Sequence, residues 1–397
     1  MPACRFVLTE MGNCEYHPAF SYQRNGPPAV LEHQAVFHLS RVSTVAPDMQ
    51  RARRRLRRHL WVMGGCTLAG AAIAFSVMPF LAGILPTDLS RSSRILEAER
   101  TVAGKPEICF FGNSVVMNGL DAKRLSEALP EHPEIWNLSS TGQQLWESVL
   151  LQQDLPDSVQ VVVQGVFANT LEEPPNIPPN KYNALVMYGF RPDEQTRRWA
   201  ESYLDAASRD YFFASPLRHR FDARWMLSGW FNTWVRSALR SDLTVDRAQT
   251  DLYYPRAYTR KVSDSALKHQ LEKYIAGHPP GEFHPDPQTE ALLVELAESY
   301  RRRGIRFVLW ILPRHPEYSR RALGDEFKRG LADYLTRLQV DHGITVVNTL
   351  DSLPAERFVD GSHPDDIGAA ILSQTFAADL KDVAICSSTR PSSSSLR

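Results

Sequence analysis

The sequence predicts an α/β protein with a flavodoxin-like, doubly wound parallel sheet of about five strands. Three observations predict this fold. Short apolar or β-branched runs alternate with longer segments of helical periodicity, which is typical of βαβ units. The chain has 397 residues, 43% of them hydrophobic, which is enough to bury a core without disulfides or metals. Several of the apolar runs end in Gly, Ser, Asn or Asp, which are residues that favour turns.

The expected elements follow in chain order. The strands are predicted at 107–112, 134–138, 159–166, 305–312 and 344–348. The helices are predicted at 121–129, 143–153, 288–303, 325–342 and 364–380. The α/β domain is expected to cover 106–383, followed by a Ser-rich, disordered tail at 384–397.

The alternating pattern breaks at 167–285, so we expect a large insertion there. Of the 39 aromatic residues of the chain, 19 fall within 167–283, among them Trp199, Trp225, Trp230 and Trp234. These rings could form a sugar-stacking platform or an acyl-chain groove. They could instead pack the insertion onto the sheet, and the roughly helical spacing of Phe221, Trp225, Trp230 and Trp234 favours packing.

The first third of the chain carries a predicted membrane anchor. Lys and Arg balance Asp and Glu at 45 each, yet residues 1–60 have a net charge of +5. Six arginines lie within 51–58, and the 26 residues from Leu60 to Leu85 carry no charge. A helix formed by these 26 residues is longer than the roughly 30 Å thickness of the hydrocarbon core, and its apolar part is longer than that of a cleaved signal peptide.

The arginine cluster predicts the orientation of this anchor. By the positive-inside rule, residues 1–59 form a cytoplasmic tail and 60–86 a single-pass helix of the inner membrane. Residues 87–105 are then a linker to a periplasmic or extracytoplasmic domain, and Met49 is an alternative start of the chain. The cluster is expected to contact anionic lipid, and we expect no nucleic-acid partner.

The five cysteines predict no disulfide framework. Two lie in the predicted cytoplasmic tail and one in the predicted span, which leaves Cys109 and Cys386 outside. Cys109 sits in an apolar run, where a small buried side chain is expected. No zinc spacing or phosphate-binding glycine motif occurs, and we expect no cofactor.

The residues that follow the predicted strands suggest acyl-transfer chemistry. In doubly wound sheets the site lies at the carboxyl ends of the strands. Ser114 follows the first strand, Gly142 the second, Asn169 the third and His315 the fourth, and Asp360 and His363 precede the last helix. A serine hydroxyl is a weak nucleophile and needs an imidazole that is oriented by a carboxylate. Ser114, His363 and Asp360 supply these groups, although each motif alone could be an ordinary turn.

The same residues resemble the SGNH/GDSL hydrolase superfamily over about 107–166 and 288–380. The resemblance implies Ser114 as nucleophile, His363 as base and Asp360 as acid, with an oxyanion hole of Ser114, Gly142 and Asn169. Two features depart from the family pattern. Asn113 stands where the family has Asp, and Gly165 and Asn169 are four residues apart in the third block. His315 is expected to contact substrate.

The chain most resembles the single-span, envelope-facing members of this superfamily, which include alginate O-acetylation proteins and the D-alanyl transfer protein of teichoic acids. The resemblance implies acyl or acetyl transfer to or from a cell-surface polysaccharide through an acyl-serine, with a multi-spanning membrane acyltransferase as a partner. Two alternatives stay open. The protein could be a plain esterase of lipid or peptidoglycan esters, or a non-catalytic polysaccharide-binding or assembly protein.

Overall fold

The computed structural model describes residues 47–84, 88–101, 106–187, 189–215, 218–219, 260–278 and 280–385. The chain divides into two compact units, residues 1–74 and 75–397. The sheet and all the residues of the predicted site belong to the second unit.

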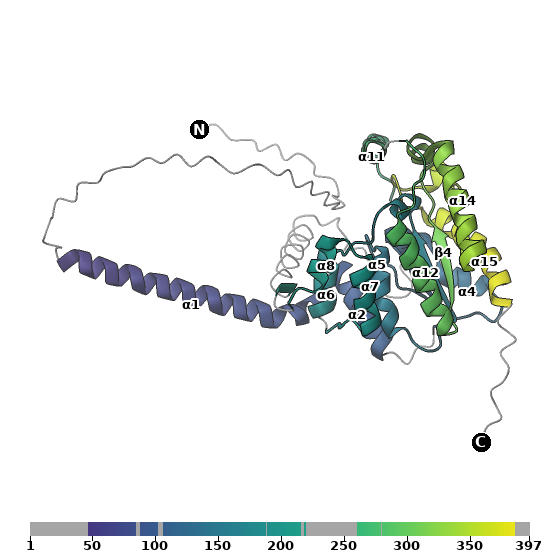
Figure 1. Cartoon of the computed structure of the whole chain (residues 1–397). Coiled ribbons are helices and arrows are strands. Elements are labelled where there is room, and N and C mark those ends of the chain that lie inside the picture. Colours follow the sequence, from purple (N-terminus) through teal and green to yellow (C-terminus); the bar gives the residue numbers. More distant parts are fainter. Residues whose placement is uncertain are drawn as a thin grey trace, which may run out of the picture. The chain divides into compact units, whose positions relative to one another are not determined.

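Helix α1 (Pro47–Ile84) contains the arginine cluster and most of the predicted membrane segment (Figure 1). Apolar side chains in its middle are exposed, with 80% of Trp61 accessible to solvent. Within the residues that the structure describes, we find no helix whose length and apolar character suffice for a membrane crossing. The membrane span therefore stays a prediction.

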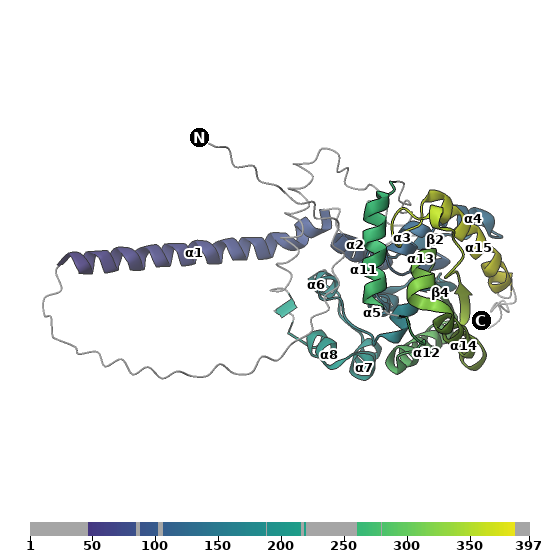
Figure 2. The ribbon, with the colours of Figure 1, turned by 90° about the horizontal axis from the view of Figure 1, so that it is seen from above.

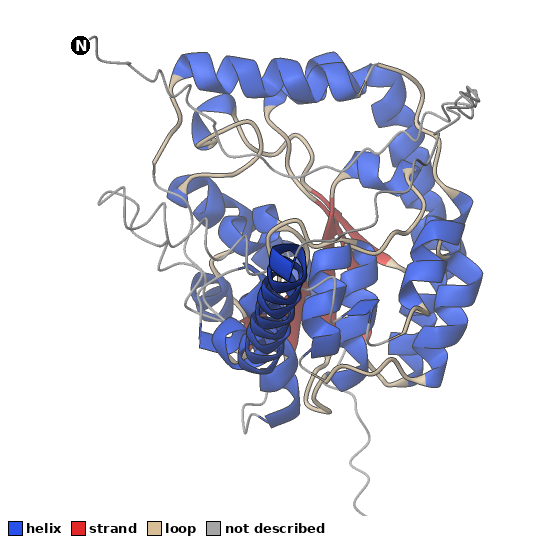
Figure 3. Ribbon diagram, turned by 90° about the vertical axis from the view of Figure 1, so that its left-hand side faces the viewer, coloured by secondary structure: helices blue, strands red, loops and turns tan. Residues whose placement is uncertain are grey.

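Five parallel strands form one sheet, as predicted. They are β1 (Ile108–Phe111), β2 (Ile135–Asn137), β3 (Val161–Val166), β4 (Arg306–Ile311) and β5 (Thr345–Asn348). Their order is β2-β1-β3-β4-β5, with every neighbouring pair parallel. Figure 3 shows the strands enclosed by helices. From β1, the chain adds β2 on one side of the sheet and then β3, β4 and β5 on the other side. The strand order therefore reverses between β1 and β3, and such folds bind ligands at this point.

The sheet is covered on both faces because side chains alternate along each strand. In β1, Cys109 and Phe111 pack in one cluster, whereas Phe110 packs in the other. The first cluster includes residues of α5 (Leu145–Leu151), α12 (Pro287–Arg302) and α14 (Gly324–His342). The second includes residues of α4 (Ala122–Ala128) and α15 (Asp366–Ile385). Figure 2 shows α4 and α15 together, apart from α12 and α14. The fold is therefore doubly wound.

The described parts of the 167–285 insertion are mainly helical. They are η2 (Ala168–Glu172), α6 (Pro179–Met187), α7 (Glu194–Tyr203), α8 (Ala206–Phe212) and α11 (Asp264–Gly277). Trp199 of α7 is 5% exposed and belongs to the first core cluster, so at this position packing is the better interpretation. Trp225, Trp230 and Trp234 lie outside the described residues.

The remaining short elements follow a strand or α5 in the chain. They are α3 (Ser114–Gly119), η1 (Gln152–Asp154), α13 (Pro316–Tyr318), η4 (Ser319–Leu323) and η5 (Ala355–Arg357). The first of them, α3, begins at the predicted nucleophile.

The segment 87–105 differs from the predicted linker. It contains helix α2 (Asp88–Thr101), in which Ile95 and Leu96 are buried in the first core cluster and Arg91 is fully buried. The segment looks like a linker in the sequence because it is rich in Arg, Glu and Ser. Its few apolar residues nevertheless fall on one helical face, which packs against the domain.

Candidate active site

The turn after β1 places Ser114 at the start of α3. The Asn113 side chain accepts a hydrogen bond from the backbone N–H of Val115 at 2.9 Å and caps this helix. Gly112 has a φ of +148°, and a Cβ there would lie 2.5 Å from Val116 Cγ2 and 2.9 Å from the Gly165 carbonyl oxygen. Only glycine fits this turn, because the backbone just after β1 closely approaches the backbone of β3 at Gly165.

The structure brings the three predicted triad residues together. His363 Nε2 lies 2.7 Å from Ser114 Oγ, although the two residues are 249 positions apart. His363 Nδ1 lies 2.9 Å from Asp360 Oδ2 and 3.1 Å from Oδ1. An ionised carboxylate only accepts hydrogen bonds, so in the neutral imidazole Nδ1 donates to Asp360 and Nε2 accepts from the serine. This arrangement can remove the proton of the Ser114 hydroxyl.

Ser114 and His363 are shielded from water, and Asp360 is held ionised. Ser114 is 5% exposed and His363 7%. Burial alone would raise the pKa of Asp360. The hydrogen bond and charge of His363, with the backbone N–H groups of Ser362 and His363, outweigh burial and hold this pKa below its ordinary value.

Helix α11 packs against the loop that carries Asp360 and His363. The Gln270 side chain accepts a hydrogen bond from the backbone N–H of Gly361 at 3.2 Å. Just before α11, the Val262 N–H donates to the Val359 carbonyl at 2.8 Å. These contacts were not foreseen, because the sequence offers no local sign that the insertion reaches the site.

The loop after β2 carries Gly142 and is bonded to the Ser114 turn. The Ser140 N–H donates to the Gly112 carbonyl at 3.0 Å, and the Gly112 N–H donates to Gln143 Oε1 at 2.5 Å. Gly142 itself is exposed, with a φ of +61°. The structure therefore joins the two loops that carry the predicted oxyanion donors, and their role in binding an oxyanion stays a prediction.

Asn169 lies in η2 beyond β3 and is bonded through its oxygen. Its Oδ1 accepts a hydrogen bond from Arg314 Nη2 at 2.7 Å. The Arg314 guanidinium lies 3.3 Å from the centroid of the Phe167 ring, and the residue is 8% exposed. The bond leaves the amide nitrogen of Asn169 as the group that could donate to an oxyanion. Arg314 adjoins His315 after β4, and this position was its only signal in the sequence.

His315 caps a helix in the structure. It is 5% exposed, its Nδ1 accepts from the Glu317 N–H at 3.2 Å, and its ring lies edge-on to Phe358. Burial lowers the pKa of His315, and the charge of Glu317 opposes this shift. These contacts give His315 a structural role as the N-cap of α13, and its predicted contact with substrate stays a prediction.

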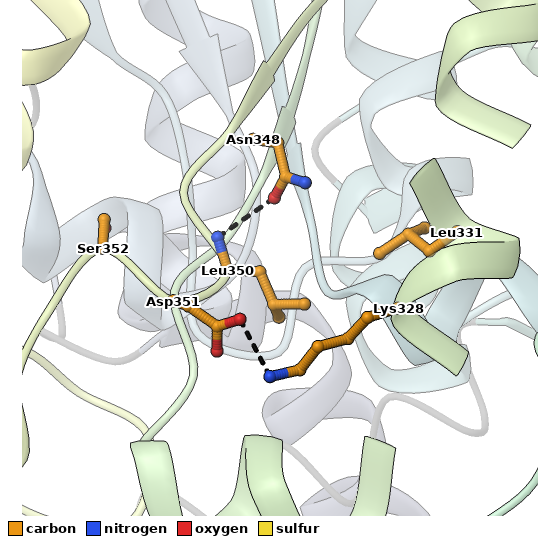
Figure 4. Close-up of a pocket in the computed structure, with 6 residues that line it drawn as sticks. All are labelled: Lys328, Leu331, Asn348, Leu350, Asp351 and Ser352. Atoms are coloured by element: carbon orange, nitrogen blue, oxygen red, sulfur yellow. Dashed lines mark hydrogen bonds and ion pairs between the residues drawn. The ribbon is translucent and has the colours of Figure 1, made fainter. Parts of the chain in front are cut away.

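A pocket of about 340 Å³ lies at the carboxyl end of β5 (Figure 4). It is lined by Lys328, Leu331, Asn348, Leu350, Asp351 and Ser352. Lys328 Nζ lies 2.9 Å from Asp351 Oδ2. The triad residues do not line this pocket. Within the described ranges, no three His, Cys, Asp or Glu side chains gather as a metal site would require.

Comparisons with known proteins add little to this geometry. No protein-family model matches the chain, and no curated protein matches it. Among solved structures, it is similar to one described as a candidate platelet activating factor from Streptococcus pneumoniae, at 14% identity and a TM-score of 0.34. The match covers 78% of this chain and 98% of that one. A likeness this distant carries no argument about the reaction.

Proposed function

We propose that this protein is a serine esterase or acyl-transfer enzyme of the SGNH type. One observation carries the proposal: His363 contacts Ser114 Oγ through one ring nitrogen and Asp360 through the other. A buried serine in an ordinary turn has no need of an oriented imidazole, whereas a nucleophilic serine requires one.

The reaction follows from these positions. As Ser114 Oγ attacks the carbonyl carbon of an ester, His363 Nε2 accepts the hydroxyl proton, and Asp360 stabilises the imidazolium. The negative oxygen of the tetrahedral intermediate accepts hydrogen bonds from the backbone N–H groups of Ser114 and Gly142 and from the Asn169 amide. His363 then protonates the leaving alcohol. Water or an acceptor hydroxyl then attacks the carbonyl carbon of the acyl-serine. His363 again accepts the proton of the attacking group and returns one to Ser114 Oγ as the acyl group leaves the serine.

The acceptor we propose is a hydroxyl of a cell-surface polysaccharide. The support comes from the sequence: the uncharged 60–85 segment, which follows an arginine cluster, predicts a domain on the periplasmic or extracytoplasmic side of the inner membrane, where such polymers lie. A multi-spanning acyltransferase would supply the acyl group. Hydrolysis of lipid or peptidoglycan esters is the alternative, and it differs only in whether water or a sugar hydroxyl takes the acyl group.

The test is covalent labelling of the full chain with a fluorophosphonate, followed by turnover of p-nitrophenyl acetate. We expect labelling at Ser114 in the wild type and its loss in Ser114→Ala and His363→Ala. Ser352→Ala is the matched control, because this serine also follows a strand of the sheet but lines the separate pocket. Labelling with turnover near background would indicate a transferase that lacks its acceptor.

The outcome that contradicts an enzyme is equally clear. If the wild type is folded by circular dichroism and is not labelled, Ser114 is not activated. Binding of polysaccharide by that unlabelled protein would then favour the non-catalytic alternative.

A further inference from the structure

A buried ion pair lies against the loop that carries Gly142. Lys181 of α6 places its Nζ 3.0 Å from Glu147 Oε2 of α5 and 2.7 Å from Ser140 Oγ of the loop. Glu147 and Ser140 are 0% exposed and Lys181 is 8% exposed. Ion pairs are uncommon at such depth, because both charges lose their hydration.

A second buried cation binds the same loop from α2. Arg91, which is fully buried, donates from Nε to the Ser139 carbonyl at 2.6 Å and from Nη2 to the Asn137 carbonyl at 2.8 Å. Its neighbour Ser92 donates to Glu147 Oε1 at 2.6 Å. Side chains from α2, α5 and α6 therefore join in one buried network around residues 137–140.

This network restricts the backbone of the loop that carries Gly142. Gly142 has no side chain to anchor it, so the direction of its N–H depends on the residues on either side. On one side, Ser139 and Ser140 are bonded to Arg91 and Lys181. On the other side, Gln143 is bonded to Gly112 of the Ser114 turn. Hydrogen bonds to buried charged groups are directional and are strong where water is excluded.

We propose that Lys181, Glu147 and Arg91 are positioning residues that orient the 139–142 loop so that the Gly142 N–H can stabilise the oxyanion. The inference rests on the proposed function and deepens it, because it assigns the preorganisation of the oxyanion hole to a network contributed by the insertion and by α2. A purely apolar packing would stabilise the fold at least as well, but it would not direct the loop.

The test uses the full chain and separates orientation from stability. Lys181→Met alone leaves Glu147 charged and buried, so we compare the double variant Lys181→Met/Glu147→Gln, which removes both charges together. We expect its Tm to stay within about 4 °C of the wild type. We expect kcat for p-nitrophenyl acetate to fall about 10-fold to 100-fold, with KM changed less than about twofold. The single variant Lys181→Arg retains the charge and the donors, so it should keep most of the wild-type kcat.

The matched control is Lys328→Met/Asp351→Asn. It removes another lysine–carboxylate pair, at 2.9 Å, from the pocket at β5. This control should leave kcat unchanged. Hydrogen exchange of a peptide covering 137–144 gives an independent measurement, and it should become faster in the first double variant only.

Two failures can be told apart. If the wild type turns over the ester and the folded Lys181→Met/Glu147→Gln variant keeps its kcat within about twofold, the positioning role is wrong and the proposed function stands. If the folded wild type shows neither labelling nor turnover, the proposed function is wrong and this inference fails with it.

Discussion

At Ser114, the proposed reactivity depends on a partner 249 positions further along the chain. The imidazole of His363 reaches the serine because the 358–364 loop is bonded to itself, with the Val359 N–H donating to the His363 carbonyl at 2.9 Å. Asp360 accepts from the ring and from two backbone N–H groups, so it both orients the histidine and closes the loop. The same contacts serve the fold and the proposed chemistry.

This double role of Asp360 predicts a pH-dependent contribution to stability. The pKa of its carboxyl lies below the ordinary value of 3.8 in the folded chain. The ionised form therefore stabilises the fold above about pH 4, and this contribution is lost as the pH falls through the folded pKa. We expect Asp360→Asn to lower the free energy of unfolding at pH 7, and to lower it by less at pH 3. Urea unfolding at both pH values measures this, and an equal difference at both would contradict the lowered pKa.

At the scale of the element, α2 shows how a polar segment becomes part of a core. It buries Ile95 and Leu96 beside the sheet, and its Arg91 donates to the loop after β2. It also buries Glu99, 7% exposed, whose two carboxylate oxygens have no hydrogen-bond partner within the described part of the chain. Burial, followed by the charge of Asp154, raises the pKa of Glu99, against the opposing charges of Arg100 and Arg303.

Removing this carboxylate should stabilise the protein. Because the folded pKa of Glu99 is raised, the folded state disfavours ionisation, and this costs more stability as the pH rises above about 4.5. We expect Glu99→Gln to raise the free energy of unfolding by on the order of 1 kcal/mol at pH 8, and by less at pH 4.5. Glu127→Gln, at an exposed position of α4, is the control and should change it by less than about 0.5 kcal/mol. A gain that is the same at both pH values would exclude this explanation.

At the scale of the whole molecule, the chain joins two units with different chemistry. The second unit contains the sheet and the candidate site. The first contains the arginine cluster and the start of the uncharged segment, whose side chains at Trp61 and Met63 are exposed. Exposed apolar surface of this kind, next to basic residues, is a marker of interaction with lipid or another apolar partner.

The predicted anchor can be tested by fractionation. In a bacterial host we expect the full chain in the membrane fraction, extracted by detergent but not by alkaline carbonate, because its 26-residue uncharged segment would lie in the hydrocarbon core. A variant that lacks residues 60–85 should be soluble. Release of the full chain by carbonate would contradict a spanning helix and leave a peripheral association.

The sequence by itself determined the strands, most of the helices of the α/β core and the three residues of the candidate triad. The periodicity that predicts an element is local, so all five strands lie within two residues of their predicted bounds. Ser114, Asp360 and His363 could be found because the carboxyl ends of parallel strands share one edge.

Only the tertiary structure decided how the remaining polar residues are used. Lys181, Glu147 and Arg91 are typical of exposed surface in a sequence, yet they are buried against a loop that lies up to 48 positions away. His315 caps α13, a role that the sequence did not indicate, and its predicted contact with substrate stays a prediction. The physical reason is the same in each case. A charged or polar side chain carries no local signal of its partner, and contacts between distant segments exist only once the chain has folded.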